Sequence, residues 1–234
     1  GLNPSDLGTL RIMMQSAGGW YLEDGKTVNI ANNNILKEAL KVYVELMNSG
    51  TVTLTPDWNA GVSAINNGEV ASSPTGAWYA GTIMGSEEQS GKWAISEIPR
   101  LGAVKDSINA SSIGGGGWYV LKGVGNSETA KDFLKETFAS DADLMNTLAK
   151  EIGLVSTLNA AAETENYQSP SEFFSNEKIF QNFSTWSGEV PVVNYGLHTY
   201  AIENIFTEYV QKIVDGADIN KTLEDAQKQI EASI

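Results

Sequence analysis

The chain has 234 residues, and its 15 Lys and Arg side chains against 29 Asp and Glu give a formal net charge of -14 at pH 7. Such a chain lacks the basic patch that displaces counterions from phosphates, which excludes DNA, RNA and anionic membrane surfaces as partners. The absence of cysteine excludes disulfides, zinc fingers, thiol nucleophiles and iron–sulfur clusters. The length allows one large domain or two small ones, and 41% hydrophobic residues suffice for a buried core.

The spacing of apolar residues predicts helices that alternate with short strands. Helices are predicted, in chain order, at residues 33–47, 60–67, 77–84, 127–139, 141–151, 171–186, 197–214 and 221–232. Strands are predicted at residues 70–73, 93–98 and 118–121, each next to a proline or glycine turn. This order indicates an α/β protein. In open α/β sheets, ligands bind where strands end and helices begin.

Motifs for nucleotide, metal and hydrolytic chemistry are missing. The glycine run at residues 114–117 precedes a predicted strand, whereas a phosphate-binding loop follows one. Asp141-x-Asp143 lacks the Gly and Glu of a calcium loop, and no G-x-S-x-G elbow accompanies His198, the one histidine. We therefore predict no cofactor, no metal and no catalytic residue. A glycoside hydrolase stays open as an alternative, because the fold sets the separation of its two carboxylates.

Aromatic residues recur beside turns. The chain has six Trp, eight Tyr and seven Phe, and the tryptophans next to turn residues are Trp20, Trp58, Trp78, Trp118 and Trp186. For a single Trp, core packing is the usual explanation. Recurrence at turns instead favours loop tips, where a flat apolar ring with one hydrogen-bond donor suits a ligand that has an apolar face and a polar edge. A pyranose ring is such a ligand, so the pattern favours sugar binding.

Four segments resemble, in order, the extracellular solute-binding proteins of carbohydrate ABC importers, of the maltose and multiple-sugar type. Residues 64–71 with Gly76-Ala77-Trp78 look like the family's F-x-x-G-x-x-A-M … G-x-W segment. The others are a glycine-led strand with a K-x-x-x-A-x-x-F-L helix at residues 116–134, an x-x-G-x-x-P segment at residues 151–156 with Ser156 in place of Pro, and a G-x-x-x-x-x-A-L-x-x-A helix at residues 216–226.

The resemblance implies an α/β, periplasmic-binding-protein-like fold of type II, in which two lobes enclose the ligand. It assigns residues 1–97 and 151–234 to the second lobe and residues 98–150 to a segment that returns to the first lobe. The match begins well inside the family's usual sequence, so we expect the N-terminal part of the first lobe to lie outside this C-terminal portion. The implied location is extracellular, periplasmic or lipid-anchored at the cell surface, with signal and anchor outside the chain.

The resemblance also implies a set of ligand-binding residues, namely Trp78, Tyr79, Gly116, Gly117, Trp118 and Tyr195. Trp78 takes the place of the family's sugar-stacking Trp, and the glycines fall where the family brings backbone close to the ligand. Tyr195 is the nearest aromatic residue in a loop where some members place a ring against the sugar. The implied partners are a carbohydrate and the permease subunits of an ABC importer. A binding protein of the same fold for a non-sugar solute stays open as a second alternative.

Overall fold

The computed structural model describes all 234 residues, Gly1–Ile234, and the chain divides into two compact units. Unit 1 consists of Gly1–Thr75, Glu97–Ile113 and Glu189–Ile234. Unit 2 consists of Gly76–Ser96 and Gly114–Gly188. Each unit is therefore assembled from segments that are distant in the sequence.

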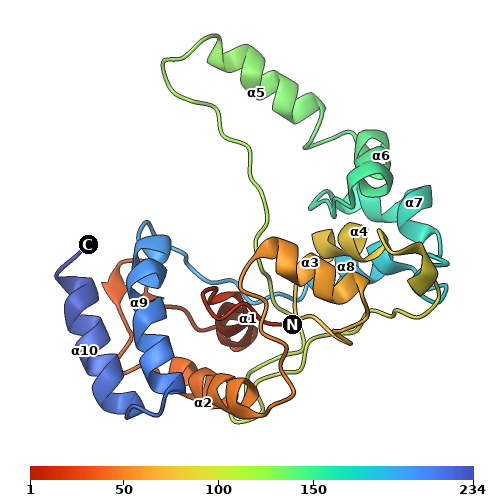
Figure 1. Ribbon diagram of the computed structural model, residues 1–234. Coiled ribbons are helices and arrows are strands. Elements are labelled where there is room, and N and C mark those ends of the chain that lie inside the picture. Colours follow the sequence, from red (N-terminus) through yellow and green to blue (C-terminus); the bar gives the residue numbers. More distant parts are fainter. The chain divides into compact units, whose positions relative to one another are not determined.

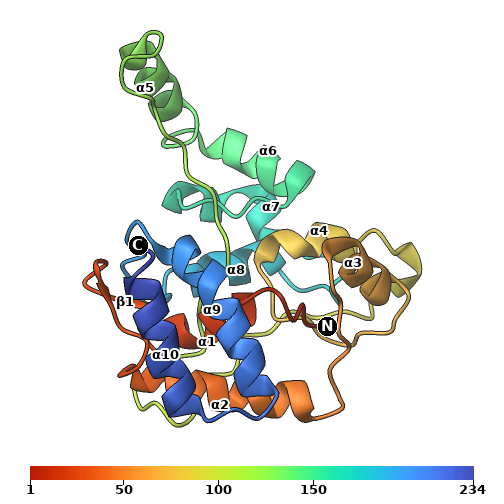
Figure 2. The ribbon, with the colours of Figure 1, turned by 60° about the vertical axis from the view of Figure 1, so that its left-hand side comes forward.

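Unit 1 is a group of helices with one short hairpin (Figure 1). Its elements are α1 (Gly8–Ser16), β1 (Leu22–Glu23), β2 (Thr27–Val28), α2 (Asn34–Asn48), α3 (Trp58–Asn66), α9 (Thr199–Val214) and α10 (Ile219–Glu231). The strands pair antiparallel, with Leu22 opposite Val28. Figure 2 shows α2 and α10 alongside α9, which agrees with the packing of both helices against it.

The core of unit 1 forms because the helices bury their apolar stripes against one another. Asn33 caps α2 by accepting a hydrogen bond from the Leu36 amide at 3.0 Å. The buried stripes consist of Leu36, Ala39, Leu40 and Tyr43 of α2, Ile202, Phe206, Val210 and Ile213 of α9, and Leu223, Ala226 and Ile230 of α10. Complete burial of a large apolar side chain contributes about 1.5–3 kcal/mol. This packing holds together segments from both ends of the chain.

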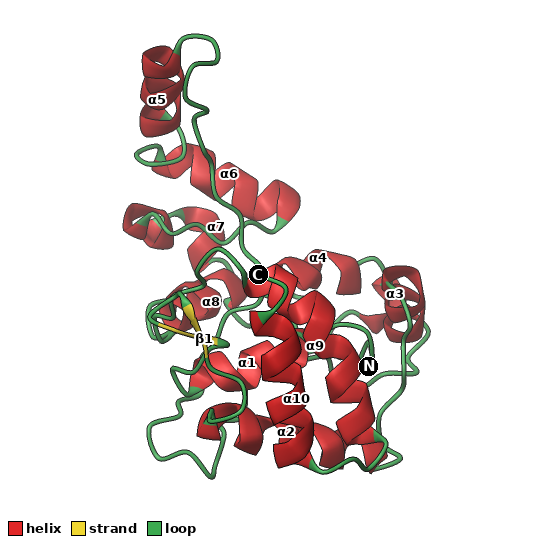
Figure 3. Cartoon of the chain, turned by 90° about the vertical axis from the view of Figure 1, so that its left-hand side faces the viewer, coloured by secondary structure: helices red, strands yellow, loops and turns green.

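Unit 2 is made of shorter helices and long connections (Figure 3). Its elements are η1 (Ala77–Tyr79), α4 (Ala80–Ile83), η2 (Glu87–Gln89), α5 (Ser127–Glu136), α6 (Ala142–Ile152), η3 (Asn159–Glu163), α7 (Glu165–Gln168) and α8 (Ile179–Ser187). A small core gathers Met145, Ala149, Ala161 and Tyr167. The Tyr167 hydroxyl accepts from the Ser156 amide at 2.8 Å, which fixes the chain after α6. No residue of α5 is buried.

The three predicted strands, at residues 70–73, 93–98 and 118–121, form no sheet in the structure. The regular strands are β1 and β2, of two residues each, and they were not predicted. Strand propensity and alternation become a strand only when a partner supplies hydrogen bonds and a face to cover. The structure is thus rich in helix, and the two-lobe architecture stays a prediction. None of the helices combines the length and apolar composition needed to cross a membrane.

Candidate ligand-binding site

Trp78 lies in a short helical turn that begins directly after Gly76. The Tyr79 ring packs edge-on against it, with centroids 5.6 Å apart and planes at 83°. Tyr79 is buried, and burial raises the pKa of its hydroxyl. Trp78 remains 45% exposed. The turn therefore holds one aromatic ring in place with a second ring behind it.

The glycine run begins beside the polar edge of Trp78. A Cβ atom added at Gly114 would lie 3.6 Å from the indole Nε1. Gly114 and Gly115 have φ angles of +77° and +102°, a conformation that other residues rarely adopt. The backbone groups of residues 114–117 take part in no hydrogen bond within the structure. The site thus combines an exposed aromatic ring with nearby backbone donors and acceptors.

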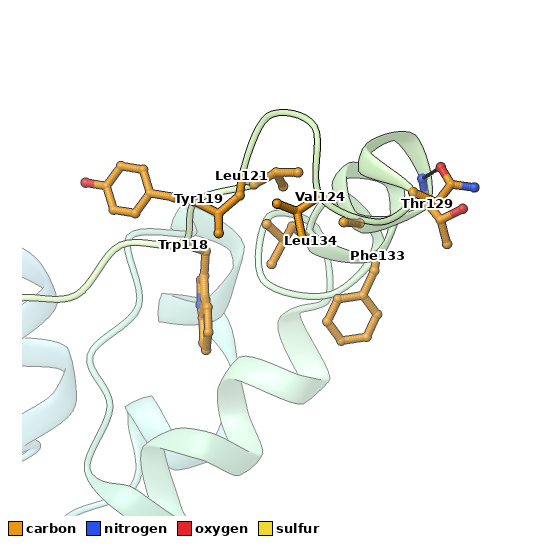
Figure 4. A pocket seen from close by; sticks show the side chains of 10 residues that line it. Trp118, Tyr119, Leu121, Val124, Thr129, Phe133 and Leu134 are labelled. Carbon is orange, nitrogen blue, oxygen red and sulfur yellow. Dashed lines mark hydrogen bonds between the residues drawn. The ribbon is translucent and has the colours of Figure 1, made fainter.

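Gly116, Gly117 and Trp118 continue away from this point and are exposed. The Trp118 ring packs at 4.9 Å from Phe138 and is 67% exposed. It lines an apolar hollow with residues of α5, shown in Figure 4. The structure therefore brings Trp78, Tyr79 and Gly114 together and places Trp118 in a different setting. The role of Gly116, Gly117 and Trp118 in ligand binding stays a prediction.

Tyr195 belongs to unit 1, where it is half-buried. Its ring lies 4.4 Å from Trp20, and its hydroxyl donates to Gln15 Oε1 at 3.5 Å. The Trp20 indole donates to Thr199 Oγ1 at 2.8 Å, and this hydroxyl donates to the Tyr195 carbonyl. Burial raises the pKa of the Tyr195 hydroxyl. The ring is thus held by several contacts, and its role toward a ligand stays a prediction.

The loop that carries Tyr195 is joined to the β1–β2 hairpin by a close approach of backbones. Gly196 has a φ of +61°, and a Cβ atom there would collide with the Gly25 carbonyl oxygen. Asn194 also donates through Nδ2 to the Asp24 carbonyl at 3.1 Å. Glycine at residue 196 is therefore required by both backbone conformation and space.

Tyr200 is an aromatic residue that sequence reasoning did not select. It stands in the first turn of α9 and is 67% exposed. In α9, Ile202, Phe206 and Ile213 are buried, and their spacings of four and seven residues place them on one face of the helix. Tyr200 lies outside this face. The helical period could therefore have marked Tyr200 as a surface ring near Tyr195.

A partly buried ion pair joins α1 to α9 in unit 1. Arg11 Nε lies 3.2 Å from Glu203 Oε1, and their side chains are 15% and 12% exposed. Burial raises the pKa of the Glu203 carboxyl, while the Arg11 charge acts in the opposite direction. Burial likewise raises the pKa of Tyr21 beside this pair. Because the pair lies within the helix packing of unit 1, it is part of the core rather than an open site.

Comparison with known proteins places these features in a family. Residues 2–175 match the family of bacterial extracellular solute-binding proteins. Since the match covers most of the chain, the chain belongs to this family. A lactose-binding protein from Rhizobium radiobacter is 36% identical over 233 residues, which make up 100% of this chain and 55% of that protein. The chain thus spans about half the length of the relative it matches.

Proposed function

We propose that the chain is the C-terminal portion of a sugar-binding protein that delivers a sugar or oligosaccharide to the permease subunits of an ABC importer. The observation that carries this proposal is the exposed Trp78 ring beside the backbone of Gly114. A flat apolar surface with polar groups at its edge matches the two kinds of surface on a pyranose ring. The identity to a lactose-binding protein supports a carbohydrate as the ligand.

The proposed whole protein has the two-lobe, type II architecture and works outside the cell, as a periplasmic or lipid-anchored protein. Residues 1–97 and 151–234 would form the second lobe, and residues 98–150 would return to the first. This assignment rests on the family resemblance, since the two units follow other bounds: residues 97–113 belong to unit 1 together with residues 1–75.

Binding and delivery would both depend on a higher affinity of the ligand for the closed form of the protein than for the open form. Sugar hydroxyls bonded to both lobes stabilise the closed form relative to the open one, and the permease would recognise the closed form. The residues proposed to hold the sugar are Trp78, Tyr79, Gly116, Gly117, Trp118 and Tyr195. No bond in the sugar breaks in this scheme, so the protein acts as a carrier rather than an enzyme.

A charged solute is disfavoured by the state of the arginines. The chain has two, Arg11 and Arg100. Arg11 is engaged with Glu203 inside unit 1, and Arg100 is exposed. A binding protein for an anion requires buried, correctly oriented cationic groups. A neutral sugar therefore fits the candidate site better.

The proposal is tested by calorimetry on the protein expressed from the complete reading frame that encodes this chain. Lactose, maltose and a set of amino acids are titrated, and we expect binding by at least one sugar. Replacement Trp78→Ala should weaken that binding about 10- to 100-fold, because the stacking surface is lost.

Trp186→Ala is the matched control for this substitution. Trp186 also packs edge-on against a neighbouring ring, with its centroid 5.8 Å from that of Phe183 and planes at 78°, but it lies on α8. We expect the sugar affinity of the Trp186→Ala variant to change less than about twofold, as for a substitution outside the site. Unchanged sugar affinity after Trp78→Ala would refute the proposal that Trp78 stacks on the sugar. Binding of amino acids alone would refute the proposal that the ligand is a sugar.

A further inference from the structure

The Tyr195 hydroxyl uses its single proton within unit 1. Tyr195 Oη donates to Gln15 Oε1 at 3.5 Å, and Gln15 is only 5% exposed. A phenol hydroxyl has one proton to donate and lone pairs with which to accept. A molecule that binds at this hydroxyl therefore meets lone pairs rather than a proton.

The other end of the Gln15 side chain determines its orientation. Gln15 Nε2 donates to the Pro191 carbonyl oxygen at 3.2 Å. A carbonyl oxygen can only accept, so the amide nitrogen must face Pro191 and the amide oxygen must face Tyr195. The reversed amide would place two acceptors together at Pro191 and lose that hydrogen bond. The Pro191 carbonyl thus determines, through Gln15, the direction in which Tyr195 donates.

Both partners of the Tyr195–Gln15 hydrogen bond are held in place by the fold. Gln15 lies in the last turn of α1, a helix that contributes Leu10 and Met14 to the core of unit 1. The Tyr195 ring lies 4.4 Å from Trp20. Rotation of either side chain away from the other would therefore disturb existing packing.

The Tyr195 hydroxyl stays protonated at neutral pH. Burial raises the pKa of this hydroxyl, and the charge of Glu203 acts in the same direction, whereas the charge of Arg11 lowers it. A phenolate, which could accept from Gln15 without donating, is thereby disfavoured. The hydroxyl is the form that a ligand would meet.

We propose that Gln15 is a positioning residue that makes Tyr195 a hydrogen-bond acceptor toward the ligand, so that this point of the site selects a ligand hydroxyl that donates. The inference rests on the proposed function, in which Tyr195 contacts the sugar. A site that is built to bond a hydroxyl rejects the analogue that lacks it. Sugars in which this hydroxyl is replaced by hydrogen or fluorine should therefore bind poorly.

Calorimetry on the protein expressed from the complete reading frame tests the selection. The probes are lactose and maltose, together with derivatives in which one hydroxyl is replaced by hydrogen or by fluorine, which accepts weakly and cannot donate. At one ring position we expect both replacements to weaken binding equally, by about 3- to 10-fold, because each removes the proton that Tyr195 accepts. If Tyr195 donated to the sugar, fluorine would be tolerated better than hydrogen.

Two variants assign this effect to the pair. Tyr195→Phe should abolish the difference between the parent sugar and its derivatives at that position. Gln15→Met has a similar size but no polar group, so it frees the Tyr195 proton. The fluoro derivative should then bind better than the deoxy derivative. If Gln15 served stability alone, Gln15→Met would weaken all these sugars by one factor and leave their ratio unchanged.

Ser16→Ala is the matched control in α1. Ser16 is fully buried, and its hydroxyl donates to the Met13 carbonyl at 2.8 Å and lies 3.0 Å from Ser107 Oγ. The substitution removes buried polar contacts next to Gln15 but leaves the Tyr195 hydroxyl with its acceptor. We expect it to lower stability without changing the ratio of the fluoro and deoxy affinities.

The direction of the hydrogen bond can also be measured without a sugar. A partner that accepts from a neutral hydroxyl raises its pKa, and a partner that donates to the oxygen lowers it. Gln15→Met should therefore lower the pKa of Tyr195 in the longer protein, followed by an NMR titration of its tyrosine side chains. The signal that disappears in Tyr195→Phe identifies the residue.

Three results would overturn the inference. One is a fluoro derivative that binds better than the deoxy derivative at every position in the unchanged protein. Another is an unchanged ratio of the two affinities in Gln15→Met, and the third is a higher pKa of Tyr195 in that variant. If neither lactose nor maltose binds, the proposed function fails, and the direction of the pKa change alone decides whether Gln15 holds Tyr195 as an acceptor.

Discussion

Helices α2 and α5 begin with the same kind of N-cap, but α2 is packed into a core and α5 is exposed. Asn33 caps α2 by accepting the Leu36 amide at 3.0 Å, and Asn126 caps α5 by accepting the Thr129 amide at 3.1 Å. Both helices carry an apolar stripe, but α2 buries four residues in the core of unit 1 whereas α5 buries none. Capping and periodicity thus determine where a helix starts and which side is apolar. Whether that side is covered depends on other segments.

The largest expected difference between the two helices is in the effect of truncating a stripe residue. Leu40→Ala in α2 should lower the free energy of unfolding of the 234-residue chain by about 2–5 kcal/mol, because Leu40 is fully buried. Phe133→Ala in α5 should change it by less than about 0.5 kcal/mol, because Phe133 is 60% exposed. Urea denaturation followed by circular dichroism measures both. Equal losses would mean that α5 is packed in solution.

Removal of the two N-caps should lower the free energy of unfolding by amounts that differ less. Asn33 also donates to the Trp20 carbonyl at 2.8 Å, so Asn33→Ala removes the cap and leaves a buried acceptor unpaired. We expect a loss of about 2–3 kcal/mol in the free energy of unfolding. Asn126→Ala removes a cap alone and should cost about 0.5–1 kcal/mol, visible as faster amide exchange within α5. A larger global effect at Asn126 than at Asn33 would contradict the comparison.

The smallest effect concerns the ion pair in the core of unit 1. Burial raises the pKa of Glu203 in the folded chain above its unfolded value, so the folded state holds this proton more tightly. This contribution to stability is present below the unfolded pKa and is lost as the pH rises through the folded pKa. Glu203→Gln should therefore gain stability relative to the unchanged chain as the pH rises above the ordinary glutamate pKa of about 4.3.

Urea denaturation across this pH range measures the difference between the two chains. Glu208→Gln is the control, because Glu208 is on the same helix with a side chain that is 70% exposed. The difference in the free energy of unfolding between the Glu208→Gln variant and the unchanged chain should depend less on pH. A relative loss of stability by Glu203→Gln with rising pH would mean that attraction to Arg11 outweighs the cost of burial.

Local patterns predicted the helices better than the strands. Residues 33–47 and 141–151 were predicted as helices and correspond to α2 and α6 within about a residue, because caps and stripes are encoded locally. The helix predicted at residues 171–186 was too long, since Ser171 instead forms a bridge with Glu177 and α8 begins at Ile179. Helix α1 was missed, and the residue at its N-cap position, Leu7, has no side chain that could cap it.

The candidate site was predictable in part. Trp78 beside a turn was evident from the order Gly76-Ala77-Trp78, and the family resemblance is confirmed by the match to bacterial extracellular solute-binding proteins. The proximity of Gly114 to Trp78 was not predictable, because these residues are far apart in the sequence. The contact of Tyr195 with Trp20 likewise depends on packing between the two ends of unit 1.

The junction between Gly196 and Gly25 bears on how the Tyr195 loop meets any ligand. Since the two backbones touch there, the loop is fixed to the hairpin when unit 1 folds. A ring that is already immobile loses little rotational freedom when a molecule binds against it, and that saving appears directly in the affinity. In the proposed role of Tyr195, Gly196 would thus lower the entropic cost of binding without contacting the ligand itself.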